Sequence, residues 1–284
     1  MLSVQELMTC LEVGLIYGIA AIGIYLTFRT INFPDLTCDG SFVLGAAVSS
    51  VMLKSGQDPY MAMALALVAG GMAGLFTGIL NVYLKIEDLL SGIIVAFMMY
   101  SVNLRIMGTN PNIAFMDDVT IFSGGYSTIK IAIIVSALVA LFGYLLITDF
   151  GLGLRSIGQN KRFASICGIN VKAMTIVGLV ASNALIGMCG GLFTQYQGFC
   201  DITQGVGTLV IGLASVIIGE KLLKIKNMLL KVLVCVLGSV IYRIFIAFAI
   251  HSDALGLRTQ DLNLITGILI IAIMCSRRKN AASK

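Results

Sequence analysis

The sequence predicts an all-α protein that crosses a membrane about nine times. Of its 284 residues, 58% are hydrophobic and only 12% are charged, whereas a soluble domain carries about a quarter charged residues. Several apolar runs, such as "LALVAGGMAGLFTGILNVYL", are about as long as the roughly 20 residues that a bilayer requires. Runs such as "NLITGILIIAIMC" leave little room for a surface that faces water.

The candidate spans follow from these apolar runs. We expect spans at about 5–28, 38–54, 60–84, 89–108, 129–148, 173–194, 206–220, 230–250 and 261–276. The first run, Leu7–Phe28, has no basic leader and no small-residue cleavage site, so we interpret it as a retained span. An irregular loop is expected at Thr109–Thr128, which contains Asn-Pro and Gly-Gly.

The basic residues predict the orientation of these spans. With the C-terminus in the cytoplasm, fourteen of the nineteen Lys and Arg residues lie on the inner side. Short cytoplasmic loops retain Lys and Arg, so we expect the N-terminus outside and the C-terminus inside. The same rule explains the net charge of +5 without a nucleic-acid partner.

A polar phrase occurs twice in the chain. "FPDLTCDGSFVLGAAVSS" at Phe33–Ser50 resembles "FCDITQGVGTLVIGLASV" at Phe199–Val216. Five expected spans, from 38–54 to 173–194, lie between Asp35 in the first copy and Asp201 in the second. Because five is odd, the copies have opposite orientations. Inverted repeats with broken helices are a recurring transporter design. We therefore expect one permease domain over 1–284, with a first repeat at 1–148, a cytoplasmic segment at 149–172 and a second repeat at 173–284.

The first copy supplies candidate substrate-pathway residues. Pro34 interrupts the helix, and Asp35 and Thr37 can cap a helix that starts near Ser41. Asp35 and Asp39 are carboxylates at membrane depth, which cost at least a few kcal/mol and usually face a pathway or a partner. A role only as helix caps remains the alternative.

The second copy and the first span add further candidates. Asp201 and Thr203 can cap the helix that enters at Gly207. Placing the Glu12 carboxylate against lipid within the first span would cost free energy, which would favour a functional role. If that span begins later, Glu12 lies at the outer interface and its position does not indicate a function. Other intramembrane residues have structural interpretations: Gly70, Gly71, Gly74 and Gly78 suit close helix packing, and Asn81, Asn103 and Asn183 suit hydrogen bonds between helices.

The inner segment Thr148–Lys172 contains an expected amphipathic helix. Phe163, Ile166 and Cys167 share its apolar side, and the opposite side is basic. Such a helix either rests on anionic lipid or docks on a protein.

Motifs for catalysis are absent from the sequence. It has no GxxxxGK[ST], HExxH or GxSxG and no Cys/His cluster. Its seven cysteines are scattered without CxxC. We expect no catalytic site, no metal site and no cofactor in this chain.

Four segments resemble a known family: "INFPDLTCDGSFVLGAA", "SVNLRIMG", "TDFGLGLRSIGQNKRFASICGINV" and "IYRIFIAFAI". They are similar to ABC-importer permeases of the branched-chain amino acid and ribose type, above all to a subgroup linked to tryptophan or tyrosine uptake. In that family the cytoplasmic segment contains a coupling helix that docks on the ATPase. The resemblance carries this contact to Gly158, Gln159, Asn160, Lys161, Arg162, Ala164, Gly168, Ile169 and Asn170.

The family's break in the first pair of spans matches Asn32, Phe33, Pro34, Asp35 and Gly40. Here "PDLTCDG" stands where many amino acid permeases have "AHG" and sugar permeases have "DLSVG", which leaves the substrate open. The resemblance implies a bacterial cytoplasmic-membrane importer for a small solute, with an aromatic amino acid preferred. It also implies a second permease copy, ATPase subunits that bind ATP and Mg²⁺, and an extracytoplasmic binding protein. An ion-coupled secondary transporter, acting through Glu12, Asp35 or Asp201, is the alternative.

Overall fold

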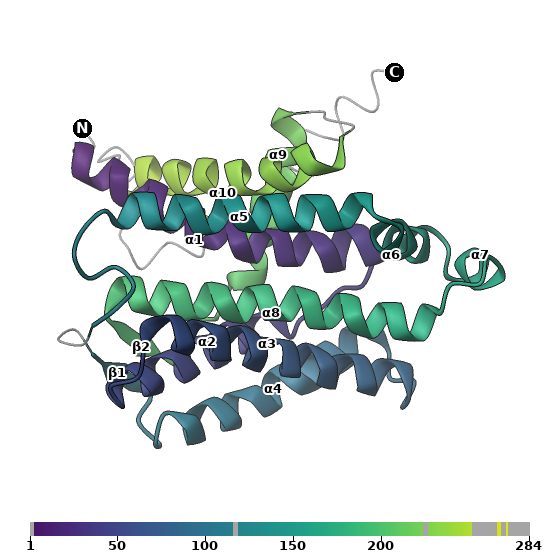
Figure 1. Ribbon diagram of the computed structural model, residues 1–284, viewed down its shortest axis with the longest axis horizontal. Coiled ribbons are helices and arrows are strands. Elements are labelled where there is room, and N and C mark those ends of the chain that lie inside the picture. The colour runs from purple at the N-terminus through teal and green to yellow at the C-terminus, as the bar shows by residue number, and fades with distance from the viewer. Residues whose placement is uncertain (1–2, 116–118, 224–226, 252–265, 268–270, 272–284) are drawn as a thin grey trace.

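The computed structural model describes residues 3–115, 119–223, 227–251, 266–267 and 271. Within these residues the fold is helical, with one short strand pair, as the sequence predicts (Figure 1). The elements in chain order are α1 (Val4–Ile24), η1 (Tyr25–Ile31), α2 (Cys38–Lys54), α3 (Pro59–Val82), α4 (Asp88–Ile106), β1 (Asn112–Ala114), α5 (Ser127–Ile147), α6 (Asp149–Gln159), α7 (Lys161–Ile166), α8 (Val171–Gln197), β2 (Phe199–Asp201), α9 (Thr208–Leu222) and α10 (Met228–His251).

Six described helices are long and apolar enough to cross a membrane: α1 with η1, α3, α4, α5, α8 and most of α10. The expected spans at 38–54 and 206–220 form α2 and α9, with 17 and 15 residues. At 1.5 Å per residue they extend about 25 and 22 Å, less than the roughly 30 Å hydrocarbon core. The expected span at 261–276 lies almost wholly outside the described residues, so the count of nine is not confirmed.

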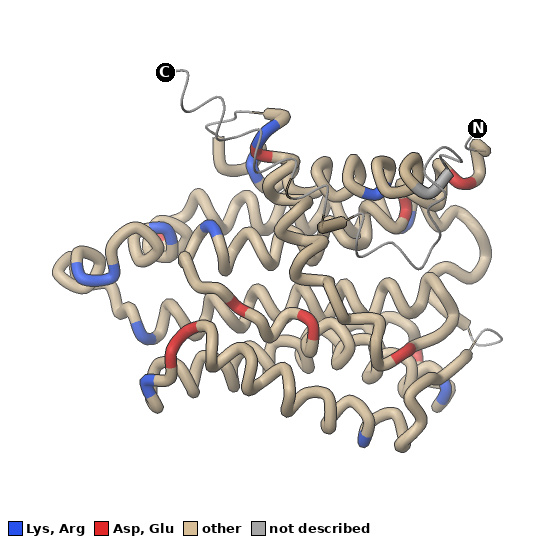
Figure 2. Tube along the Cα trace, turned by 180° about the vertical axis from the view of Figure 1, so that it is seen from behind, with Lys and Arg blue, Asp and Glu red and all other residues tan. Residues whose placement is uncertain are grey.

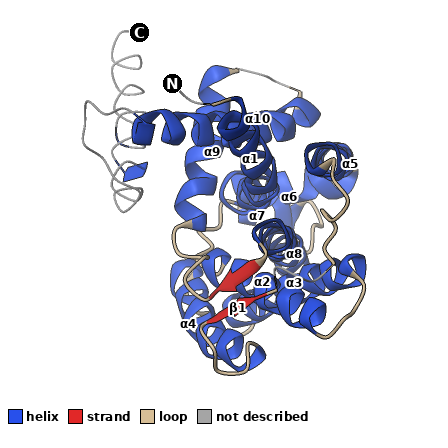
Figure 3. Ribbon diagram, turned by 90° about the vertical axis from the view of Figure 1, so that its left-hand side faces the viewer, coloured by secondary structure: helices blue, strands red, loops and turns tan. Residues whose placement is uncertain are grey.

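Helix α8 lies at the centre of the bundle. Seen along the bundle in Figure 3, it lies between α1, α5 and α10 on one side and α2, α3 and α4 on the other. It approaches α3 closely at Gly70 and Gly74, where an added Cβ would lie 2.3 Å from the carbonyl oxygens of Asn183 and Leu179 respectively. This confirms the predicted close packing of the glycine-rich helix, since any larger residue would push the two backbones apart.

The first span ends in a π-helix. Its i+5 geometry persists over η1 and ends at Asn32, whose φ of 57° is left-handed. Pro34 follows, and its missing N–H prevents a further helical turn. The chain therefore crosses from η1 to α2 in a non-helical segment, residues 32–37, which ends in a turn at residues 36–37. Isolated π-helical turns are frequent at functional sites.

Candidate functional site

Asp35 forms the centre of a buried polar network at the break between η1 and α2. Its carboxylate is fully buried and accepts hydrogen bonds from the backbone N–H of Thr37 (2.9 Å) and from Nδ2 of Asn183 (2.6 Å). Oδ1 of Asn183 in turn accepts from the Ser41 hydroxyl at 2.7 Å, and the Thr37 hydroxyl bonds the Thr77 hydroxyl at 2.7 Å. The network fixes the non-helical segment 32–37 to α3 and α8.

The expected caps of α2 are wrong in detail. The helix begins at Cys38, three residues before Ser41, and Thr37 is its N-cap residue without a side-chain cap bond. The reason is competition. The Thr37 hydroxyl is hydrogen-bonded to Thr77 on α3 instead. The Asp35 carboxylate accepts hydrogen bonds from Asn183 and from the backbone N–H of Thr37.

Asp39 caps a helix far away in the sequence. Its carboxylate oxygens accept hydrogen bonds from the backbone N–H groups of Gly207 (3.2 Å) and Leu209 (2.9 Å) at the start of α9. The expectation that Asp201 and Thr203 cap this helix is therefore wrong. The first turns of α2 and α9, which belong to the two copies of the repeated phrase, meet through this carboxylate.

Asp201 stabilises its own turn instead. It accepts from the backbone N–H of Thr203 at 2.7 Å, and Nδ2 of Asn112 lies 3.4 Å from its second oxygen. Asn112 also pairs with Asp201 in the antiparallel β1–β2 ladder. Both residues lie in the connection between α8 and α9. Asp201 is half-buried there and Thr203 is exposed.

Glu12 is half-buried near the start of the first span. Its carboxylate accepts hydrogen bonds from the Thr128 hydroxyl on α5 and from the Tyr196 hydroxyl on α8, the latter at 2.7 Å. The side chain therefore joins three helices and does not face lipid alone. Of the proposed pathway residues, the structure brings Asp35, Thr37 and Asp39 together with Asn32 at the break, and Glu12 lies at the other end of α1.

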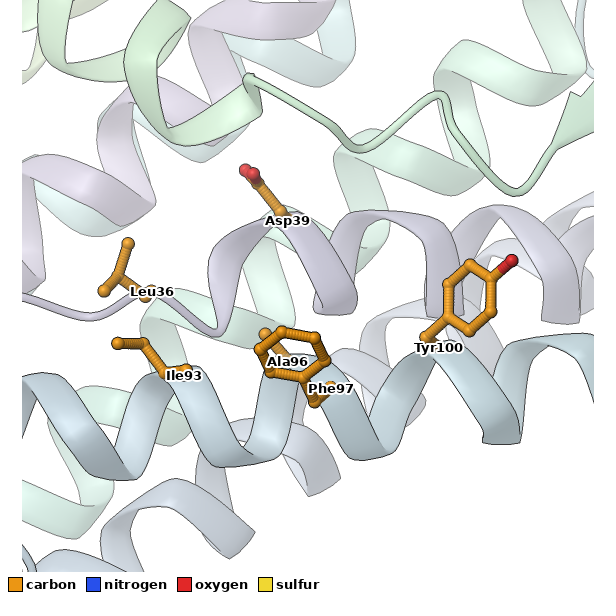
Figure 4. A pocket seen from close by; sticks show the side chains of 6 residues that line it. All are labelled: Leu36, Asp39, Ile93, Ala96, Phe97 and Tyr100. Carbon is orange, nitrogen blue, oxygen red and sulfur yellow. The ribbon is translucent and has the colours of Figure 1, made fainter.

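A cavity of about 480 Å³ opens beside Asp39. Figure 4 shows the residues around it: Leu36 and Asp39 from the break and α2, and Ile93, Ala96, Phe97 and Tyr100 from α4. The aromatic side chains of α4 were not among the residues predicted for the site. Their only signal was their spacing, because Phe97 and Tyr100 are three residues apart and lie on one helix face.

The segment that carries the predicted coupling residues forms two helices, α6 and α7. Asn160 separates them, and its side chain caps α7 by accepting from the N–H groups of Arg162 and Phe163 at 3.0 Å. Asn170 caps α8 in the same way, with the N–H of Ala173 as donor. Gly168, at φ 83°, makes the turn between α7 and α8.

The nine coupling candidates divide into an exposed and an inward group. Gln159, Asn160, Lys161, Arg162, Gly168 and Asn170 are exposed. Ala164 is fully buried, Ile169 packs against the core, and Gly158 faces η1. An added Cβ at Gly158 would lie 2.0 Å from the carbonyl oxygen of Thr30, so α6 is in direct backbone contact with the π-helix.

Comparison with known proteins identifies the family. Residues 7–274 match the family model for the permease component of the branched-chain amino acid transport system. The chain belongs to this family. It is a permease and a multi-pass membrane protein.

Individual relatives are transport permeases too. The chain is 40% identical over 272 residues to the tyrosine transport system permease protein of Clostridioides difficile, covering 95% of this chain and 91% of that one. It is 27% identical over 224 residues to a probable branched-chain amino acid transport permease of Methanocaldococcus jannaschii, covering 71% and 70%. The D-allose transport system permease of Escherichia coli is 27% identical over 189 residues, covering 65% and 58%. No solved structure matches the chain.

The described part of this permease contains no cluster of three or more His, Cys, Asp or Glu side chains able to hold a metal ion. Its polar groups are instead arranged as helix caps and interhelical hydrogen bonds around the break. Such an arrangement can bind and position a solute or hold a movable joint between helices.

Proposed function

We propose that this permease is the membrane subunit of an ATP-binding cassette importer that moves an amino acid, preferably an aromatic one, into the cytoplasm. It acts as a homodimer with two ATPase subunits, which bind ATP and Mg²⁺, and it receives solute from an extracytoplasmic binding protein. Its N-terminus lies outside and its C-terminus in the cytoplasm.

The observation that carries the proposal is the exposure of α7. This helix projects from one end of the bundle (Figure 1). It presents Lys161 and Arg162 together with the apolar side chains of Phe163 (61% exposed) and Ile166 (83% exposed). An exposed apolar patch flanked by charge is typical of a protein-binding surface. A docking helix that fits an ATPase cleft needs both features.

The charges at this end support the proposed orientation. Lys161 lies 3.5 Å from Asp88 in the first turn of α4, and Lys85 and Lys172 flank the neighbouring helix ends. Blue segments accordingly gather at the left-hand end of Figure 2. Clustered Lys and Arg are expected on the cytoplasmic side.

A chain of contacts leads from α7 to the break. Helix α6 touches η1 at Gly158 and Thr30, and the Arg29 guanidinium at the end of η1 pairs with Glu220 near the end of α9. The break follows directly, and there Asp39 holds the other end of α9. Movement of α7 by the ATPases would therefore shift η1 and α9 together. ATP can drive this change because it interacts differently with the two conformational states of the transporter.

The amino acid substrate is supported by the relatives. The tyrosine transport permease is similar along nearly the whole chain, whereas the allose permease is more distant and covers less of it.

Reconstitution tests the proposal. The permease, the candidate ATPase and the binding protein are placed in vesicles, and uptake of labelled tyrosine is measured with and without ATP. We expect uptake only with ATP, and we expect Arg162→Glu to abolish it while hydrolysis by the ATPase continues. Arg105→Glu is the matched control, since Arg105 is an exposed arginine in the last turn of α4, outside the coupling segment. Uptake driven by an ion gradient in the permease alone would instead establish the secondary transporter.

A further inference from the structure

Two adjoining cavities share one wall between α2 and α4. The larger, of about 480 Å³, and the smaller, of about 130 Å³, are both lined by Asp39, Ala96 and Tyr100. The smaller one extends beneath the connection to α9, where Gly205 and Val206 line it. Together they have the size of a site for a small molecule.

Two polar side chains in these walls, Asn103 and Asp39, carry hydrogen-bond acceptors. Asn103 is 1% exposed and lines the smaller cavity. Its Nδ2 donates to the carbonyl oxygen of Gly40 at 3.3 Å, and within the described structure its Oδ1 has no hydrogen-bond partner. A buried acceptor without a donor destabilises the folded state. A donor supplied by a ligand would satisfy this oxygen.

Asp39 adds negative charge to the same wall. Each of its oxygens accepts one backbone N–H from the start of α9, and a carboxylate oxygen can accept a second hydrogen bond. The start of α9 would by itself attract an anion, but Asp39 already occupies it. No Lys, Arg or His is among the described residues that line either cavity. The walls therefore favour a cation with N–H donors.

Aromatic rings form the opposite wall. In Figure 4 Phe97 and Tyr100 lie on α4, which runs alongside the first turn of α2, while the Asp39 side chain extends towards α9. Phe97 is 77% exposed and Tyr100 is 54% exposed, so the described part of the chain leaves both rings largely uncovered. Aromatic faces attract ammonium groups and stack on other rings.

We infer that these cavities form a binding site for the ammonium group of an amino acid, which Asp39 and Asn103 Oδ1 accept while the ligand's side chain packs on Phe97 and Tyr100. The inference rests on the proposed function and specifies its substrate class as a primary amine with an apolar or aromatic side chain. The site lies beside the contact between α2 and α9. A bound ligand would therefore touch helices that are expected to move with the ATPases.

Cysteine protection tests this site. Ala96 is half-buried and lines both cavities, so the Ala96→Cys variant of the full chain in lipid nanodiscs is labelled with N-ethylmaleimide. Labelling rates are read by mass spectrometry with tyrosine, tyramine or 3-(4-hydroxyphenyl)propanoate present. The last compound is tyrosine without its amino group. The exposed natural Cys167 is the control thiol in the same molecule.

We expect saturating tyrosine and tyramine to slow labelling of Cys at position 96 at least about threefold and to leave Cys167 unchanged. The amine-free acid should not protect. Asn103→Leu, which removes the unpaired acceptor and should fold normally, is expected to weaken protection about tenfold, as is Asp39→Asn.

Four results would overturn the inference: no protection, equal protection by the amine-free acid, protection by tyrosine but not by tyramine, or unchanged protection in Asn103→Leu. These results are independent of the proposed function. ATP-driven uptake without protection would rule out this binding site and support the importer function. Protection in a permease whose uptake does not depend on an ATPase would support the binding site and rule out the importer function.

Discussion

Replacing Gly158 with alanine is expected to separate α6 from η1. The new Cβ would lie 2.0 Å from the carbonyl oxygen of Thr30, whereas real Cβ atoms almost never approach closer than 3.0 Å. One of the two backbones must therefore move by about 1 Å. Overpacking of this kind costs about 1–3 kcal/mol, and the gain in helix propensity from glycine to alanine returns about 1 kcal/mol at most.

Gly153 on the same helix provides the matched control. Its added Cβ would meet only the terminal methyl group of Met174, at 2.8 Å, and that flexible side chain can rotate away. Gly153→Ala should therefore keep most of the propensity gain. We expect the two variants to differ by about 1–3 kcal/mol, with Gly158→Ala the less stable.

The assay is thermal unfolding of the full chain in nanodiscs, combined with ATP-driven uptake. Gly158→Ala should unfold at a lower temperature than both wild type and Gly153→Ala, and it should lose uptake at temperatures where it is still folded. Equal unfolding temperatures for the two variants would refute the backbone contact between α6 and η1. Normal uptake in a destabilised Gly158→Ala variant would refute its role in coupling.

Further predictions concern the break and the coupling segment. Asp39→Ala should lower the free energy of unfolding by about 1–3 kcal/mol because two backbone N–H groups at the start of α9 lose a charged acceptor. Asp201→Ala should cost less because the Asp201 carboxylate accepts from one backbone N–H, that of Thr203, rather than from two; chemical denaturation compares the two variants. Asn183→Ala should cost about 3 kcal/mol or more, since it leaves the fully buried Asp35 short of a donor, and Asp35→Asn in the same chain should recover part of the loss. Lys161→Ala should change stability by less than about 1 kcal/mol because its ion pair is exposed; a larger loss would mean that this pair holds α7 in place.

The sequence predicted those features that depend on local patterns. Apolar runs long enough to cross a bilayer identified the six long helices, and the spacing of small residues predicted the close packing at Gly74. The polar composition of Thr148–Lys172 predicted a helical segment apart from the spans. Its division at Asn160 was not predicted, because a helix cap of this kind has no effect on hydrophobic periodicity.

Contacts between distant segments could not be predicted. Asp201 and Thr203 were expected to cap α9 because they lie close before it in the sequence, but the N–H donors bond to Asp39 in the other copy of the repeated phrase. The loop at Thr109–Thr128 was expected to be irregular, but it contains β1, whose three residues are too few to show a strand period. Asn103 was predicted to form a hydrogen bond between helices, and its Nδ2 does donate to the Gly40 carbonyl oxygen on α2. Only the structure shows its unpaired Oδ1 beside a cavity.

The inverted orientation of the two repeats stays a prediction, because the meeting of α2 and α9 is one contact and not a comparison of the two halves. The same holds for the positions of the termini and for the docking of α7.

Labelling of Cys167 tests the central claim most directly. It is exposed and follows α7 immediately, and the half-buried Cys10 and the C-terminal Cys275 are first replaced by serine so that they cannot react. We predict that a membrane-impermeant maleimide leaves Cys167 unlabelled in intact cells, labels it in inside-out vesicles, and fails to label it there once the ATPase is bound. Labelling in intact cells, or labelling that the bound ATPase leaves unchanged, would contradict the account.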